Sequence, residues 1–117
     1  PDLDRLLKEC YRVLVQNVTL YITCPNFEGL VEMFQQRKHL YYVRRSVLGD
    51  GSTPYDYHRS ILWPELLIGK LREIGFSEVY DISKERLEEL QYDDELKARG
   101  VSPEDFIQMK IHIKAVK

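Results

Sequence analysis

The sequence predicts a small α/β domain in which three strands alternate with helices along the chain. Several stretches carry apolar residues at helical spacing, which gives each helix one buried stripe. Other stretches alternate apolar and polar residues, as expected of strands with one face against a core. With 117 residues and 44% hydrophobic content, the chain is long and apolar enough for a single domain over residues 1–117.

Charge is balanced along most of the chain. Charged residues make up 31% of the sequence, the formal net charge is -2, and the two signs are interspersed. This balance leaves no electrostatic footprint for a nucleic acid or an anionic membrane, so we expect neither as a partner. One basic cluster stands apart, and we interpret it as a solvated helix end and loop: Arg37, Lys38, His39, Arg44 and Arg45.

Apolar stretches are short throughout the sequence. None approaches the roughly 20 residues that span a bilayer, and the opening residues lack signal-peptide character. We therefore expect a cytoplasmic protein. The two cysteines, Cys10 and Cys24, are then expected to be free thiols.

The first quarter of the chain predicts helix, strand and helix in that order. Residues 3–14 have helical apolar spacing, and Asp2 is placed to cap them. The stretch Val18–Cys24 alternates as a strand, which Pro25-Asn26 ends because proline donates no ladder hydrogen bond. Residues 27–36 then predict a short helix.

The middle of the chain predicts a long loop followed by a strongly delimited helix. Residues 37–59 show no sustained period, and loops of that length are functional or disordered. The helical period returns after Pro64, a residue that the first turn tolerates. Gly75 followed by Phe76 predicts a Schellman ending, in which glycine takes a left-handed conformation.

The remaining segment predicts two further strands around a charged helical stretch. Residues 79–82 indicate a short strand, Ser83 is placed to cap the next helix, and Leu87 and Leu90 are its expected buried positions. Another polar helical turn ends near Gly100.

The end of the sequence predicts a turn and a strand with one wet face. The turn is expected at Ser102-Pro103-Glu104, and residues 107–115 alternate. Lys110, His112 and Lys114 fall on the polar face, and we expect them to face solvent unless a further helix or a partner covers them.

Three stretches together resemble the C-terminal half of a class I S-adenosylmethionine (SAM)-dependent methyltransferase domain. Residues 3–14 followed by 20–27 resemble the family's "reCyRVLkPGG" helix and the strand that ends in Pro-Asn. Residues 57–60 followed by 64–76 resemble its "HR.f.pe.L..lL.eaGF" helix, and residues 109–116 match its closing strand in position. The resemblance covers nearly the whole chain in the right order.

Two departures from the family pattern bear on function. Val15-Gln16-Asn17-Val18 stands where the family has Lys-Pro-Gly-Gly. No glycine-rich turn follows a first strand, and no acidic residue ends a second one, although these features bind the cofactor in Rossmann-like folds. The resemblance implies that such features would lie before Pro1. The chain alone is then expected to bind no cofactor, and to bind SAM only when an N-terminal half completes it.

The resemblance also implies a partial Rossmann-like sheet. Its strands are equivalent to 5-7-6 of the family, with the last strand antiparallel and central. The strand Val18–Cys24 then has an unpaired edge, and exposed edges invite pairing. We expect a homo-oligomer or a partner chain at that edge, or a longer polypeptide of which these residues are a piece.

The resemblance places His58 and Arg59 near the mouth of a substrate site. Tyr55, Tyr57 and Trp63 would supply aromatic walls there. A neutral His58 is the candidate general base for methyl transfer to oxygen or nitrogen. The alternative is that His58 and Arg59 hold the long loop against the sheet by hydrogen bonds.

Asn26 completes the set of candidate substrate-binding residues. It follows the carboxyl end of a strand, where open α/β sheets bind ligands, but it can equally cap the helix that begins at Phe27. Cys24 lies on the apolar strand face and is expected in the core. The histidines and cysteines lack the short ligand spacings of zinc sites, so no metal is expected.

Three functions are compatible with the sequence. The first is a truncated methyltransferase-like protein without activity of its own, which serves in binding or assembly. The second is a fragment or subunit of an active SAM-dependent methyltransferase that acts on a small molecule. The third is an unrelated small α/β ligand-binding module, which a different strand order would favour.

Overall fold

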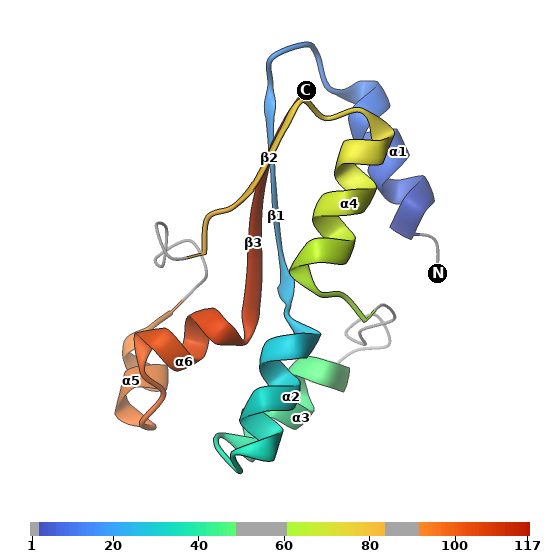
Figure 1. Ribbon diagram of the computed structural model, residues 1–117. Coiled ribbons are helices and arrows are strands. Elements are labelled where there is room, and N and C mark those ends of the chain that lie inside the picture. The colour runs from blue at the N-terminus through green and yellow to red at the C-terminus, as the bar shows by residue number, and fades with distance from the viewer. Residues whose placement is uncertain (1–2, 49–60, 84–91) are drawn as a thin grey trace.

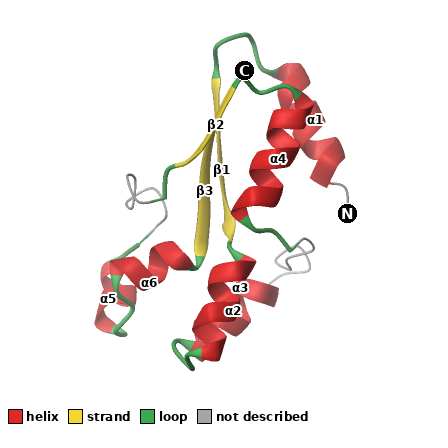
Figure 2. Ribbon diagram, viewed as in Figure 1, coloured by secondary structure: helices red, strands yellow, loops and turns green. Residues whose placement is uncertain are grey.

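The computed structural model describes residues 3–48, 61–83 and 92–117, which form helices and strands around one small sheet (Figures 1 and 2). The helices are α1 (Leu3–Val13), α2 (Phe27–Gln35), α3 (Leu40–Leu48), α4 (Pro64–Ile74), α5 (Asp94–Ala98) and α6 (Pro103–Gln108). The strands are β1 (Thr19–Pro25), β2 (Glu78–Asp81) and β3 (Lys110–Val116).

The sheet has the order β1-β3-β2, and β3 runs antiparallel to both neighbours. Ile22 pairs with Ile113 on one side of β3, and Tyr80 pairs with Lys114 on the other. The α/β prediction is confirmed, and the last strand lies in the middle as expected. β1 and β2 are therefore parallel to each other, with the last strand between them.

The main core lies between the sheet and two helices, α1 and α4, which share one side of the sheet in Figure 1. β3 contributes Ile111, Ile113 and Ala115, none of which is exposed, and α4 contributes Leu67 and Leu71. Strict alternation along β3 is what places these three side chains on one face.

A second core lies at the carboxyl end of β1, where α2, α3 and α6 meet. Its buried residues are Leu30, Met33, Val43, Val101, Phe106 and Met109. The Tyr92 hydroxyl donates a hydrogen bond of 2.7 Å to the Val101 carbonyl, and its ring packs edge-on against Phe106. The helices that follow β1 thus have a core of their own beside the sheet.

The link from α1 to β1 has no glycine, as the sequence shows, and Asn17 takes the conformation that a glycine often adopts in such a turn. Asn17 takes a left-handed conformation with φ of 68°, which asparagine tolerates better than most residues. The Lys117 ammonium group donates to the carbonyls of Tyr11 and Leu14, the latter at 2.7 Å, and so satisfies the end of α1. β3 therefore fixes α1 as well as the sheet.

The helix α4 begins and ends as predicted. Pro64 occupies its first turn. The amides of Gly75 and Phe76 both donate to the Leu71 carbonyl at 3.2 Å; the Phe76 bond is the 6→1 bond of a Schellman ending, and Gly75 has a positive φ of 132°. Phe76 is buried and meets the ring of Tyr11 edge-on at 5.0 Å.

Residues 37–59 were predicted as one long loop, and this is wrong for the part that the structure describes. Residues Leu40–Leu48 form α3. Only Val43 is fully buried in that helix, while Leu40 and Tyr41 are exposed, so the apolar residues follow no single face. Packing against α2 stabilises α3, and the sequence pattern of α3 alone does not reveal this contact.

The turn predicted at Ser102-Pro103-Glu104 is also wrong, because it begins α6. The Ser102 hydroxyl accepts a hydrogen bond of 3.1 Å from the Asp105 amide, and Pro103 is the first helical residue. The helix extends to Gln108, so β3 begins at Lys110 rather than at Ile107. Alternation of apolar residues alone did not separate the helix from the strand.

The polar face of β3 is less exposed than predicted. His112 is buried, at 2% exposed, and Lys110 and Lys114 are half-buried. The ring of Tyr21 lies 6.2 Å from that of His112. The prediction that these side chains face solvent is therefore wrong for His112, and Lys110 and Lys114 are only partly exposed.

Ser83 uses its polar groups locally. Its amide and hydroxyl both donate to Asp81 Oδ1, at 2.9 and 2.7 Å, and its hydroxyl oxygen accepts from the His112 amide at 3.1 Å. Leu87 and Leu90, the expected buried residues of the following helix, lie outside the described residues.

At Gly29 the backbone of α2 lies so close to Gln108 that there is no room for a side chain. A Cβ atom at Gly29 would lie 1.6 Å from the Gln108 carbonyl oxygen, where α2 meets α6. We expect Gly29→Ala to lower the free energy of unfolding by about 1–3 kcal/mol, because backbone must move. Gly69→Ala is the control: nothing lies within 4 Å of that site on α4, so it should leave stability unchanged or raise it. Urea unfolding followed by circular dichroism measures both, and an equal effect of the two substitutions would contradict the prediction.

Candidate site at the carboxyl end of β1

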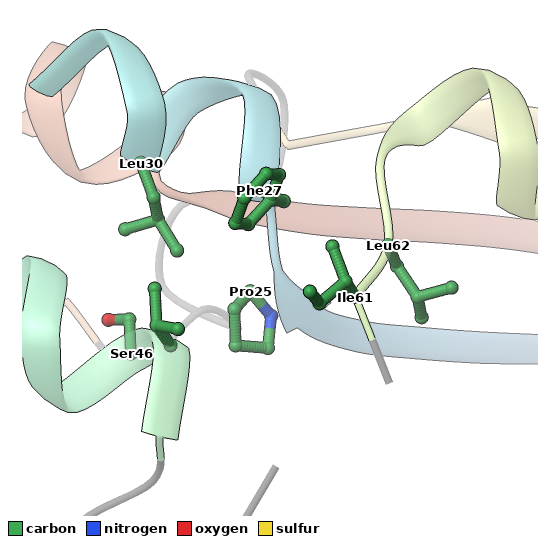
Figure 3. Close-up of a pocket in the computed structure, with 7 residues that line it drawn as sticks. Pro25, Phe27, Leu30, Ser46, Ile61 and Leu62 are labelled. Carbon is green, nitrogen blue, oxygen red and sulfur yellow. The ribbon is translucent and has the colours of Figure 1, made fainter. Parts of the chain in front are cut away.

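A small pocket opens at the carboxyl end of β1, the position at which open α/β sheets bind ligands (Figure 3). Backbone hydrogen bonds build it. The Asn26 amide donates to the Met109 carbonyl, and the Phe27 amide donates to the Leu62 carbonyl, both at 2.9 Å. The lining residues are Pro25, Phe27, Leu30, Ser46, Val47, Ile61 and Leu62.

The pocket is mainly apolar and shallow. It contains about 240 Å³ of empty space, part of which is open to solvent. Among the described residues that line it, only Ser46 has a hydroxyl group and none carries a charge. Such a site fits an apolar part of a small molecule, because complete ligand sites in proteins have volumes of about 300–1,000 Å³.

Asn26 serves as the helix cap that the sequence offered as one of two roles. Its side-chain oxygen accepts a hydrogen bond from the Gly29 amide at 3.4 Å, and its backbone is extended. It lies directly between two residues that shape the pocket region, Pro25 and Phe27.

Trp63 lies next to Leu62, the residue whose carbonyl accepts the hydrogen bond from Phe27. It occupies the N-cap position of α4 without a side-chain cap and is 37% exposed. Because Phe27 is hydrogen-bonded to Leu62, the structure brings the neighbourhoods of Asn26 and Trp63 together.

The other predicted site residues cannot be placed. Tyr55, Tyr57, His58 and Arg59 lie outside the described residues. In the chain they shortly precede Ile61 and Leu62, two residues that line the pocket.

Sequence reasoning missed Lys110 at this end of the sheet. It lies opposite Pro25 in the register, and its ammonium group is 5.9 Å from the centre of the Phe106 ring. Burial lowers the pKa of Lys110, a nearby Cys24 thiolate would oppose that shift, and the charge of Arg45 adds to it. The neighbouring residues in the chain, Met109 and Ile111, are both apolar, and this was the available signal that Lys110 is partly buried.

Cys24 is the second titratable group whose surroundings change its chemistry. It packs partly buried against the main core, as predicted, and both cysteines are free. Burial raises the pKa of its thiol to about 11, and the positive charge of Lys110 opposes that shift. Cys24 is thus an inert thiol at neutral pH.

Neither a metal site nor a membrane span is visible in the part of the chain that the structure describes. Across residues 3–48, 61–83 and 92–117, no group of three or more His, Cys, Asp or Glu side chains could hold a metal ion. Within the same residues, every helix is too short or too polar to cross a bilayer. Comparison of the chain with protein-family models, curated proteins and solved structures found no match.

The shifted thiol predicts a stability change at alkaline pH. Between its ordinary pKa of 9.0 and the folded value of about 11, the unfolded chain loses the Cys24 proton and the folded chain keeps it. The free energy of unfolding should therefore fall as the pH rises through that window, by up to about 3 kcal/mol from this group. Urea unfolding of the protein and of Cys24→Ala at a series of pH values measures the difference.

The control for this experiment is Cys10→Ala, which leaves Cys24 and Lys110 in place. It should keep the alkaline loss that Cys24→Ala removes. A stability difference between the protein and Cys24→Ala that does not change with pH would contradict the prediction.

Proposed function

We propose that these residues form the acceptor-side half of a class I SAM-dependent methyltransferase-like domain, which joins a cofactor-binding half through the outer edge of β1. The observation that carries this proposal is the strand order, in which a reversed last strand lies between two parallel strands. The sequence resemblance implies the same order and direction. By itself this half would bind no SAM and transfer no methyl group.

The strand order is informative because simpler folding patterns would not produce it. Parallel strands joined by a helical crossover commonly lie next to each other. Here the connection from β1 to β2 includes α4, but the two strands are not neighbours. β3 lies between them and runs antiparallel to both. An unrelated small α/β module, the third function compatible with the sequence, gives no reason for this arrangement.

The described residues do not fit SAM. The pocket is apolar and has no carboxylate to bind ribose hydroxyl groups. The described glycines also form no glycine-rich turn after a strand. A cofactor-binding half would have to supply both features, and the pocket at the end of β1 would then contact an apolar part of the acceptor.

The outer edge of β1 is suited to strand pairing. The Asn26 amide donates to the Met109 carbonyl, and the Lys117 amide donates to the Val18 carbonyl. Because hydrogen-bonded pairs alternate with non-bonded pairs along an antiparallel ladder, the even-numbered residues of β1 are the ones whose backbone bonds to β3. The amides of Thr19 and Thr23 point away from β3, and no described strand pairs with that side.

The side chains of β1 do nothing to discourage such pairing. Proteins protect open edges with charged residues, proline or bulges. From Val18 to Cys24 the strand has no charged residue, and Pro25 stands only at its end. An uncharged, regular edge is typical of a strand that has a neighbour in the working assembly.

The face of the sheet opposite α1 and α4 supports the same conclusion. Tyr21 and Tyr80 on that face are 46% and 48% exposed. The complete α/β domain proposed here has helices on both faces of its sheet. A cofactor-binding half would cover these two aromatic rings.

Amide hydrogen exchange of the 117-residue chain tests the edge. We expect the amides of Thr19 and Thr23 to exchange fast, while those of Leu20 and Ile22 between β1 and β3 are protected. Protection of Thr19 and Thr23 that grows with protein concentration would identify self-pairing as the alternative. Protection of both at every concentration would show that the edge is already sealed, and would overturn this part of the proposal.

Calorimetric titration with SAM tests the functional part. The chain alone should show no binding, and it should gain binding when it is combined with a half that carries strands 1–4 and a glycine-rich turn. Thr23→Pro removes one outward amide and should weaken this gain, whereas Gly69→Ala on α4, where nothing lies within 4 Å, should not. Binding of SAM by the isolated chain with Kd of about 1 μM would contradict the proposal.

A further inference from the structure

The helices α2 and α3 form a hairpin whose tip carries apolar and basic side chains together. α2 ends at Gln35 and α3 begins at Leu40, so only four residues join them, and Figure 1 shows the hairpin at the carboxyl end of β1. We call the following exposed residues the hairpin tip: Phe34, Arg37, Lys38, Leu40, Tyr41 and Arg44.

Three apolar side chains of the hairpin tip are in contact with solvent. Phe34 is 51% exposed, Leu40 is 42% exposed and Tyr41 is 62% exposed. Single exposed apolar residues are common on protein surfaces, but three lie here within eight residues, on either side of the turn that joins α2 and α3, and grouped apolar exposure indicates binding.

Hydrogen bonds tie the turn between α2 and α3 to the rest of the fold. His39 Nε2 lies 2.9 Å from Asp105 Oδ2, which ties the turn to α6. The Lys38 amide donates to the Met33 carbonyl at 2.9 Å. Arg37 and His39 have φ of 57° and 50°, a conformation that costs about 1 kcal/mol or more in residues other than glycine.

The charge of this region is opposite to that of the whole chain. Residues 27–48 contain four Arg or Lys residues and two Glu residues, a net charge of +2, whereas the whole chain carries -2. The Arg37 guanidinium group lies 4.8 Å from the centre of the Phe34 ring, so positive charge and apolar surface are interleaved at the hairpin tip.

We propose that the hairpin tip docks on the surface of an anionic lipid bilayer. Such surfaces bind protein segments that insert apolar and aromatic side chains at the level of the headgroups and place Lys and Arg against anionic lipids. The aliphatic Leu40 distinguishes this partner from a nucleic acid, which would use the positive charges and the aromatic rings but gains little from a leucine.

The proposal departs from the expectation that composition alone supported. The net charge of the whole chain conceals the positive net charge of residues 27–48, and the basic cluster was interpreted as a solvated helix end and loop. In the structure the Arg37 guanidinium group lies over the ring of exposed Phe34, and Tyr41 is exposed as well. The proposal does not rest on the methyltransferase assignment, because it uses no residue of the pocket.

Flotation of the 117-residue chain with lipid vesicles tests the proposal. We expect binding to phosphatidylcholine vesicles in which about a third of the lipids are anionic, weak or no binding to pure phosphatidylcholine, and loss of binding at high salt. Arg37→Gln with Lys38→Gln should weaken binding by about 30-fold, since each basic residue contributes about fivefold at such a surface. Phe34→Ala with Tyr41→Ala should weaken it without changing its salt dependence.

The controls remove the same kinds of side chain from other exposed positions. Lys8→Gln with Arg72→Gln and Leu6→Ala with Tyr80→Ala should leave vesicle binding unchanged, and circular dichroism shows whether each variant is folded. Three outcomes would overturn the proposal: no binding to anionic vesicles, equal effects of control and tip variants, or tip-dependent binding of single-stranded nucleic acid in place of vesicles.

Discussion

The fold depends on the antiparallel pairing of β3 with both of its neighbours. Every ladder hydrogen bond between strands in the described sheet involves this strand. β3 also supplies the buried layer of Ile111, Ile113 and Ala115 against α1 and α4, and the residue after it, Lys117, satisfies the carbonyl end of α1. Without β3, the parallel strands β1 and β2 would not be hydrogen-bonded to each other, and the main core would lose the side chains that pack against α1 and α4.

The parts that the sequence predicted are those in which local chemistry and tertiary packing agree. The Schellman ending at Gly75 and the proline at the start of α4 are local signals that packing did not override. The strand order came from the family resemblance, and the central place of β3 agrees with it. The predicted cap at Asn26 likewise depends on neighbours within three residues.

The parts that sequence reasoning missed depend on contacts between distant segments. The helix α3 has a mixed surface and forms where α2 covers it, so its own pattern is uninformative. His112 looked exposed because it alternates with Ile111 and Ile113, yet it is buried. In the candidate site, Asn26 and Trp63 could be chosen from their positions beside predicted elements, whereas Lys110 required the register of β3 against Pro25.

The position of β3 in the chain has a consequence for how the protein is made. During translation, β1 and β2 are synthesised before residues 110–116, so both strands exist for a time without their sheet partner. Until the seven residues of β3 are synthesised, the uncharged strand β1 and the apolar sides of α1 and α4 lack their native partner and are open to premature association. Chaperone binding during synthesis would meet that need, and the slow step of folding would be the closure of the longest-range pairing rather than the formation of any helix.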